Sequence, residues 1–356
     1  MIGRSSVFGR RLLGWYDRAH RDLPWRLSPD RPGPLDPYHV LLSETMLQQT
    51  QVATVVPYFR RFLDRFPTIE DVARAAEQDV LRLWQGLGYY SRARNLHATA
   101  KKVVSEFGGT LPTSLQDLLS LPGIGRYTAG AIVSIAFDQP APIVDGNVTR
   151  VICRLDGIRS DPRDKQTREL LWQRAEEIVP KTRPGDFNSA LMELGATVCI
   201  PRNPQCLICP VSAHCQALAS GLQEKIPVPR KAKSTPLVRR HTYCIHHADQ
   251  YLIEQRPARG RWASMWQFIT VDPVEARSRP IRIREPVLLA TLQHALTHRR
   301  YEFDVFAANA VGRNRSKGDS NRRWVRFDDL DQYPMPRPHV RMIELLERMK
   351  RADLKK

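Results

Sequence analysis

Four cysteines near the middle of the chain place the tightest constraint on its fold. Cys199, Cys206, Cys209 and Cys215 follow the spacing C-x6-C-x2-C-x5-C and lie within seventeen residues. Four thiolates this close in sequence suit a [4Fe-4S] cluster, in which each iron takes one cysteine. Zinc stays open as an alternative, although structural zinc sites usually use two C-x2-C pairs and this stretch has one. The spacing predicts a compact metal-bound loop.

The loop between the first two cysteines carries a cation. Residues 200–205 read Ile-Pro-Arg-Asn-Pro-Gln, and both ends of this run are pinned if the cysteines bind a metal. A pinned loop can present Arg202 to a phosphate group. The metal is therefore expected to serve binding geometry, and Arg202 is a candidate DNA-binding residue.

The apolar periodicity changes along the chain and divides it into domains. At 356 residues the chain exceeds what one hydrophobic core usually serves. From about residue 5 to 222, apolar residues recur at helical spacing between turn signals, which predicts eight to ten short helices. A Pro-rich, basic run follows, too stiff for a helix interior. We expect a helical domain over 1–222, a linker over 223–236 and a second domain over 237–356.

The second domain has a strand-like pattern. Short runs of apolar and β-branched or aromatic residues at 251–253, 266–270 and 301–306 predict strands, and a helix is expected near 338–350. The run from Gly312 to Arg323 is a low-complexity loop of Arg, Ser, Lys, Gly and Asn. This pattern predicts a smaller α+β domain.

The charge balance favours a polyanionic partner. Lys and Arg outnumber Asp and Glu by 55 to 37, which gives a formal net charge of +18. Neutralising phosphates with Lys or Arg releases counterions and strengthens binding, so nucleic acid is the expected partner, although a generally basic surface is the plain alternative. No apolar run approaches a membrane span and the N-terminus lacks a signal-peptide core, so no membrane partner is expected.

The cysteine usage bears on the compartment. Outside the cluster only Cys153 and Cys244 remain, which argues against a disulfide framework and for a reducing interior. We expect a bacterial cytoplasmic location associated with the nucleoid, and a monomer.

A glycine-rich turn marks a candidate phosphate site. Leu121 to Gly125 reads Leu-Pro-Gly-Ile-Gly and precedes an amphipathic run. Gly123 and Gly125 allow a tight turn whose backbone N–H groups point outward, where a DNA phosphate fits. An ordinary helix–helix turn would look similar. The context is typical of a helix-hairpin-helix motif, with Leu121, Gly123 and Gly125 as DNA-binding residues.

Five ordered motifs carry a resemblance to a known family. They are the run Leu41–Val52 (LLSETMLQQTQV), the run Gly86–Leu96 (GLGYYSRARNL), the hairpin, the run Val144–Val148 (VDGNV) and the four cysteines. The hairpin and cysteines resemble the endonuclease III superfamily, and the full set resembles the adenine DNA glycosylases of the MutY type. The resemblance implies a mainly α N-terminal region, with a six-helix barrel module and an iron–sulfur module. A smaller α+β Nudix-like domain and a [4Fe-4S] cluster on the four cysteines are also implied.

Two carboxylates carry the chemistry that the resemblance implies. Cleaving the bond between deoxyribose and adenine needs a general acid on the purine and negative charge beside an oxocarbenium-like sugar. The resemblance assigns the acid to Glu44 and the charge to Asp145, with Asn147 hydrogen-bonded to Asp145 or to a phosphate. Taken singly, Glu44 could be a first-turn acid behind a Ser43 cap, and Asp145 with Gly146 an ordinary turn.

Tyr127 occupies the position at which bifunctional relatives carry a lysine. A lysine amine attacks the sugar and nicks the strand through a Schiff base. A phenol cannot form that imine, so the sequence predicts a glycosylase with little or no strand-nicking activity.

The same resemblance implies a DNA interface and an adenine pocket. The target base must leave the duplex, and Gln49 and Tyr89 are expected to wedge into the vacancy. Arg92 and Arg94 are further DNA-binding candidates. Tyr89 and Tyr90 could instead be core aromatic residues, and this alternative is stronger for Tyr90. The adenine pocket is expected to include Trp25, Arg26 and Leu47, next to a long loop over 28–36.

The C-terminal domain is expected to inspect the opposite base. Family members carry a Phe-Ser-His loop that contacts 8-oxoguanine; here the corresponding residues are Leu296, Thr297 and His298. No Nudix hydrolase motif is present in the sequence, so binding is the expected role. A hydroxyl and an imidazole are kept, and such polar groups can separate two bases that differ by one oxygen and one N–H.

The function implied is removal of adenine mispaired with 8-oxoguanine or guanine in double-stranded DNA, by base flipping and acid-assisted hydrolysis. A thymine or uracil mismatch glycosylase of the same superfamily is one alternative, because the thymine relative also has Tyr in place of the hairpin Lys. A non-catalytic lesion-binding protein is another, although Glu44 or Asp145 would then be expected to be missing.

Overall fold

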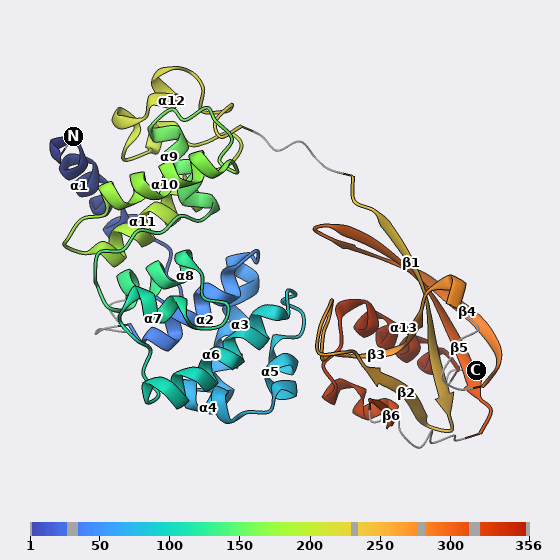
Figure 1. The fold of residues 1–356 in the computed structure, drawn as a ribbon. Coiled ribbons are helices and arrows are strands. Elements are labelled where there is room, and N and C mark those ends of the chain that lie inside the picture. The colour runs from blue at the N-terminus through green and yellow to red at the C-terminus, as the bar shows by residue number, and fades with distance from the viewer. Residues whose placement is uncertain (1, 27–34, 229–233, 276–281, 313–320, 354–356) are drawn as a thin grey trace. The chain divides into compact units, whose positions relative to one another are not determined.

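The chain folds into two compact units. The computed structural model describes residues 2–26, 35–228, 234–275, 282–312 and 321–353 (Figure 1). Unit 1 comprises Met1–Arg74 and Asn95–Lys231, and unit 2 comprises Ala75–Arg94 and Ala232–Lys356. The boundary after Lys231 falls within the expected linker. The association of Ala75–Arg94 with the C-terminal part was not anticipated.

Unit 1 is helical. Its helices among the described residues are α1 (Ile2–Ala19), α2 (Pro37–Leu47), α3 (Val52–Arg65), α4 (Ile69–Arg74), most of α6 (Ser91–Phe107), α7 (Leu115–Leu119), α8 (Arg126–Ala131), α9 (Gly146–Leu155), α10 (Lys165–Ile178), α11 (Pro184–Thr197) and α12 (Gln216–Ala219). A π-helical turn, η1 (Ile132–Ala136), extends α8, and the cysteine loop contains the short 3-10 turns η2 (Cys206–Ile208) and η3 (Ser212–His214). The helical fold class predicted for the N-terminal region is confirmed, but the described residues before Gly221 form twelve α-helices, more than the eight to ten expected.

Side-chain caps explain where key helices begin. Asp36 accepts a hydrogen bond from the Tyr38 N–H at the start of α2, whose first residue is Pro37. Asp145 does the same for α9 by accepting from the Val148 N–H. Both caps satisfy an N–H that has no partner within the helix.

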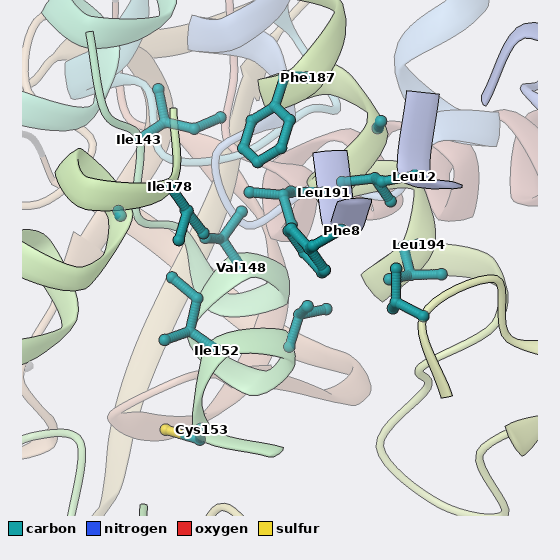
Figure 2. Packing of buried hydrophobic residues seen from close by; sticks show 14 of the residues in the cluster. Phe8, Leu12, Ile143, Val148, Ile152, Cys153, Ile178, Phe187, Leu191 and Leu194 are labelled. Atoms are coloured by element: carbon teal, nitrogen blue, oxygen red, sulfur yellow. The ribbon is translucent and has the colours of Figure 1, made fainter. Parts of the chain in front are cut away.

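The core of unit 1 forms where α1, α9 and α11 meet (Figure 2). Phe8 and Leu12 lie one turn apart on α1, and α9 contributes residues at the same spacing. The cluster includes Phe8, Leu12, Val148, Ile152, Phe187, Leu191 and Leu194. This apolar stripe holds the N-terminus of α9, and with it Asp145, against α11.

Unit 2 contains a six-stranded sheet. The strands are β1 (Leu237–His247), β2 (Gln250–Gln255), β3 (Trp266–Val271), β4 (Ile283–Leu296), β5 (Arg299–Ala310) and β6 (Arg322–Arg326), in the order β4-β5-β1-β3-β2-β6. Strands β1 and β5 pair in parallel and the other pairs are antiparallel. The unit also contains α5 (Glu77–Trp84), α13 (Arg337–Asp353) and the turns η4 (Pro273–Glu275) and η5 (Phe327–Gln332).

Alternating residues of the sheet build two cores. Cys244 and Phe268 face a cluster that includes Met342 of α13, while Tyr243 and Ile269 belong to a second cluster. The predicted strands at 251–253, 266–270 and 301–306 and the predicted closing helix are confirmed as parts of β2, β3, β5 and α13. The expected low-complexity loop is described only at its ends, and Arg322 and Arg323 begin β6.

None of the helices in the described part of the chain combines the length and the apolar character needed to cross a lipid bilayer.

Candidate active site

A single pocket in unit 1 brings the two expected carboxylates together. Glu44 on α2 and Asp145 at the start of α9 both line this cavity of about 580 Å³, although they lie 101 positions apart in the sequence. Tyr127 of α8 and Met192 and Glu193 of α11 also line it. The pocket is therefore built from elements that only the tertiary fold can join.

Glu44 has the properties of a general acid. Its side chain is buried, and the Tyr127 hydroxyl donates a short hydrogen bond to Oε2. Burial raises the pKa of Glu44 to about 7, and nearby Asp145 adds to the rise, while Tyr127 and Arg26 oppose it. A carboxyl group with this pKa holds a proton near neutral pH and can still release it.

The helix-start alternative for Glu44 is wrong. Glu44 lies in the interior of α2, and the Ser43 hydroxyl donates to the Val40 carbonyl at 3.0 Å instead of capping the helix.

Asp145 is oriented by a chain of hydrogen bonds. Oδ1 accepts from the Val148 N–H at 2.7 Å, and Oδ2 accepts from Asn147 Nδ2 at 3.1 Å. Asn147 Oδ1 in turn accepts from Arg150 Nη2 at 2.8 Å, and Arg150 Nε donates to the Cys199 carbonyl at 2.7 Å. Burial raises the pKa of Asp145, and the N–H groups of Val148 and Asn147 oppose that rise.

A buried ion-pair cluster forms another wall of the pocket. Glu193 is fully buried and accepts from Arg21 Nε at 2.6 Å and Arg26 Nη2 at 2.8 Å. Burial opposes its ionisation, but the hydrogen bonds and charges of Arg21 and Arg26 outweigh burial and lower the pKa of Glu193. The sequence analysis missed Arg21 and Glu193. A Glu in the otherwise apolar run Ala190–Ala196 was the available signal, since a lone acid on a buried face needs a partner.

The three residues expected in the adenine pocket all line this cavity. Arg26 forms an ion pair with Glu193, which also lines the cavity, and Leu47 lies at the end of α2. Trp25 is buried and its ring packs edge-on against Phe59 at a centroid distance of 5.3 Å. Most of the neighbouring loop over 28–36 lies outside the described residues.

The hairpin turn depends on Gly123. Its φ of +74° lies in the left-handed region, and a Cβ there would come within 2.4 Å of Asn95 Nδ2. Gly125 forms the N-cap of α8 and is exposed, whereas Leu121 is buried beneath the turn. Leu121 therefore holds the turn from inside, and the two glycines leave its backbone accessible.

Both candidate wedge residues have left-handed backbone conformations. Gln49 has a φ of 58° and lines the pocket of unit 1. In unit 2, Tyr89 has a φ of 47° and is 42% exposed, and its hydroxyl contacts Thr297 Oγ1. Tyr90 is buried, in agreement with the core alternative for this residue. Non-glycine residues rarely adopt this conformation, and it often marks functional positions.

The Arg92 side chain is buried and donates to the Gly88 carbonyl at 3.1 Å, and burial lowers its pKa to about 10. The guanidinium thus supports the turn before Tyr89, and its expected DNA contact stays a prediction. Arg94 donates to the Ala263 carbonyl at 2.8 Å within unit 2, whereas Arg202 of unit 1 is exposed.

The expected recognition residues lie at a hairpin tip. Thr297 and His298 form the exposed turn between β4 and β5, and Leu296 is the last residue of β4 and packs against the sheet core. The segment is therefore mostly strand, and only two residues form a loop.

The four clustered cysteines are free thiols held close to one another. Burial raises the pKa of Cys209 to about 11, and the charges of Cys199, Cys206 and Cys215 contribute to this rise. Arg154, which is also buried, donates to Cys199 Sγ at 3.3 Å. This donor set and its buried cation fit an anionic metal–thiolate centre, although no three His, Cys, Asp or Glu side chains in the described residues are arranged as a metal site.

Comparison with known proteins places the chain in a family. Residues 42–177 match the HhH-GPD superfamily of base excision DNA repair proteins, and residues 241–345 match the NUDIX domain. The adenine DNA glycosylase of Rattus norvegicus is 35% identical to this chain, over 99% of the chain and 80% of the rat protein. The chain belongs to the adenine DNA glycosylases. The family and enzyme class expected from the sequence are confirmed.

Solved structures support the same fold for the helical part. A thermostable thymine-DNA glycosylase is similar over 61% of this chain and 98% of its own length, with 31% identity and a TM-score of 0.55. A trapped endonuclease III–DNA covalent intermediate covers 62% of this chain and 99% of its own, with a TM-score of 0.52 and 24% identity, which shows the fold alone. The rat relative differs from both because its match extends through the C-terminal region.

Proposed function

We propose that this chain removes adenine mispaired with 8-oxoguanine or guanine from double-stranded DNA by hydrolysing the N-glycosidic bond. The observation that carries the proposal is that Glu44, whose pKa burial raises to about 7, lines one pocket together with Asp145. A base flipped into this pocket meets an acid on one side and a carboxylate on the other. Paired carboxylates divide acid and charge-stabilising work in glycoside hydrolysis in the same way.

Each side chain has one role in the proposed reaction. Glu44 donates its proton to a ring nitrogen of adenine, so that the base leaves as a neutral molecule. Asp145 remains ionised and stabilises the positive charge on the sugar until water adds at the anomeric carbon. The proton that this water loses returns to the Glu44 carboxylate. Tyr127 donates to Glu44 and steadies the carboxylate that forms.

The ion-pair wall is proposed to bind the adenine base. Glu193 and Arg26 present a fixed acceptor and a fixed donor to the cavity, and Trp25 and Leu47 supply apolar surface. Pockets that combine apolar walls with a few fixed polar groups hold a planar base in one orientation.

Thymine excision is the second candidate. The likeness to a thymine-DNA glycosylase favours it over other reactions, and Tyr127 is compatible with both substrates. The buried proton donor Glu44 argues for a purine, since adenine leaves more readily after protonation.

The remaining contacts are proposed for DNA and for a cofactor. Gly123, Gly125 and Arg202 are proposed to bind phosphates, Gln49 and Tyr89 to hold the opened stack, and Thr297 with His298 to contact the opposite base. Cys199, Cys206, Cys209 and Cys215 would hold a [4Fe-4S] cluster, which when bound would fix the loop that carries Arg202. Iron and sulfide analysis with a visible absorption spectrum tests the cluster; a colourless, zinc-containing protein would contradict it.

Single-turnover cleavage tests the proposed reaction. Duplexes with A opposite 8-oxoguanine, A opposite G, T opposite G, and thymine glycol are compared with and without alkali. We expect adenine release with strand breakage only after alkali. The Glu44→Gln variant should bind the mismatch and leave it intact. Full activity in that variant, or cleavage confined to T opposite G, would contradict the proposal.

A further inference from the structure

A π-helical turn lies behind the pocket. Tyr127 on α8 and Ile135 on η1 both line the cavity, eight residues apart. In a continuous α-helix such residues would lie about 80° apart around the axis, because each residue adds about 100°. A π-helical turn contains more residues per turn, so it reduces this angle and brings both side chains toward the same face.

One buried amide ties this turn to its surroundings. Asn188 of α11 is fully buried, and its Nδ2 donates to Ser134 Oγ and to the Ala141 carbonyl, each at 2.8 Å. Ser134 Oγ donates to the Gly130 carbonyl at 2.7 Å, so it can only accept from Asn188. This fixes the amide orientation. Its Oδ1 then has no hydrogen-bond partner among the residues that the structure describes, and a functional role is one explanation for such a cost.

Close backbone packing surrounds the same junction. A Cβ on Gly130 would come within 2.3 Å of the Pro142 carbonyl, and one on Gly185 within 2.5 Å of the Ser134 carbonyl. The junction therefore joins three walls of the pocket. These are the helix with Tyr127 and Ile135, the segment that leads to Asp145, and α11 with Glu193.

We propose that Asn188 is a positioning residue for base excision, which locks the π-helical turn to the segment before Asp145 and so sets Tyr127, Ile135 and Asp145 around the bound base. The inference rests on the proposed adenine excision. Asn188 touches neither base nor sugar in this scheme, and it acts through the groups that do.

The test compares single-turnover rates of wild type and Asn188→Leu, on whichever duplex the wild type cleaves. We expect a loss of about tenfold or more in rate, with affinity for a duplex carrying a non-hydrolysable deoxyadenosine analogue unchanged within about threefold. Because Tyr127 lowers the pKa of Glu44, a displaced Tyr127 should also move the alkaline limb of the pH–rate profile to higher pH.

Thr167→Val is the matched control. It removes the part-buried hydrogen bond of 2.9 Å that buried Thr167 on α10 donates to Ser160 Oγ, and α10 contributes no residue to the pocket. We expect it to lower the melting temperature and leave the rate and the pH profile unchanged. Ser134→Ala removes one acceptor of Asn188 without changing apolar packing. This variant is assayed in place of Asn188→Leu if that protein does not fold.

Two results would overturn the inference: a wild-type rate and pH profile in a folded Asn188→Leu or Ser134→Ala protein, or an equal rate loss in Thr167→Val. A wild type that cleaves no adenine duplex would instead refute the proposed function.

Discussion

At the scale of single residues, the two pocket carboxyls must hold opposite protonation states. Glu44 acts only when protonated and has a pKa of about 7, so the rate should fall as pH rises through 7. Asp145 acts only when ionised, and burial raises its pKa above 3.8, so the rate should also fall in acid. Single-turnover rates across pH should therefore follow a bell. A rate that stays level from pH 6 to pH 9 would remove Glu44 from the acid role.

Stability should report the same group independently of catalysis. The folded pKa of Glu44 exceeds its ordinary 4.5, so the folded state keeps a proton that the unfolded chain releases between pH 4.5 and 7. The free energy of unfolding therefore falls as pH rises through that window. Above pH 7 it is lower by about 3 kcal/mol than below pH 4.5. Glu44→Gln abolishes this loss.

Denaturant unfolding of both proteins at pH 4.5 and pH 8 measures the effect. The free energy of unfolding of the Gln variant minus that of wild type should be larger at pH 8 than at pH 4.5. An equal difference at the two pH values would mean that Glu44 is not buried as a carboxyl group.

The sequence predicted the candidate catalytic residues of the pocket better than the residues around them. Glu44, Asp145 and Tyr127 lie in short motifs that can be recognised from the sequence alone, and all three line the pocket. The burial of Arg92 could not be predicted from the sequence, because the exposure of a charged side chain depends on tertiary packing. Glu193 was missed because its partner Arg21 lies 172 residues away.

At the scale of helices and strands, α9 and α11 approach too closely for any side chain at Gly195. A Cβ there would lie 2.6 Å from Asn147 Cβ and 3.0 Å from its Cα. Gly195→Ala should therefore lower the melting temperature and the excision rate together, because α9 must move and Asp145 starts that helix. In an open helical site the same change stabilises by up to about 1 kcal/mol.

Gly14→Ala in α1 provides the comparison, since the nearest atom to its Cβ is Arg18 Nη1 at 3.7 Å. Thermal unfolding and single-turnover assays of both variants distinguish the two sites. Equal behaviour would show that α9 and α11 can separate at no cost.

The strands show why elements are harder to predict than motifs. Strands β2, β3 and β5 alternate or are apolar enough to be recognised. In β4, register shifts between Arg284 and Val287 and between Leu288 and Ala290 interrupt the alternation. In β1, the run Arg239–His241 is polar although all of it pairs with β5, and His241 also pairs with β3. Sheet pairing overrides local composition in both cases.

At the scale of the whole molecule, the formal charge of +18 makes binding to duplex DNA depend on salt. Log affinity should fall linearly with log salt concentration, and each lost phosphate contact should reduce the slope by about 1. Arg202→Gln should show this reduction because the side chain is exposed.

Arg163→Gln is its control, since Arg163 Nε already donates to both Asp161 oxygens at 2.7 and 2.9 Å. Titrations of one duplex at several salt concentrations measure both slopes. Identical slopes for the two variants would exclude Arg202 from the interface.

The carboxylate of Asp145 does two jobs with its two oxygens. Oδ1 caps the start of α9, Oδ2 accepts from Asn147, and the residue lines the cavity, so a change to Ala removes fold contacts along with a charge. An Asn at this position keeps an oxygen for the Val148 N–H but loses both the charge and the acceptor for Asn147 Nδ2. Loss-of-function alleles at residue 145 should thus divide into two kinds, a well-folded inert protein and an unstable one, and abundance in the cell would tell them apart.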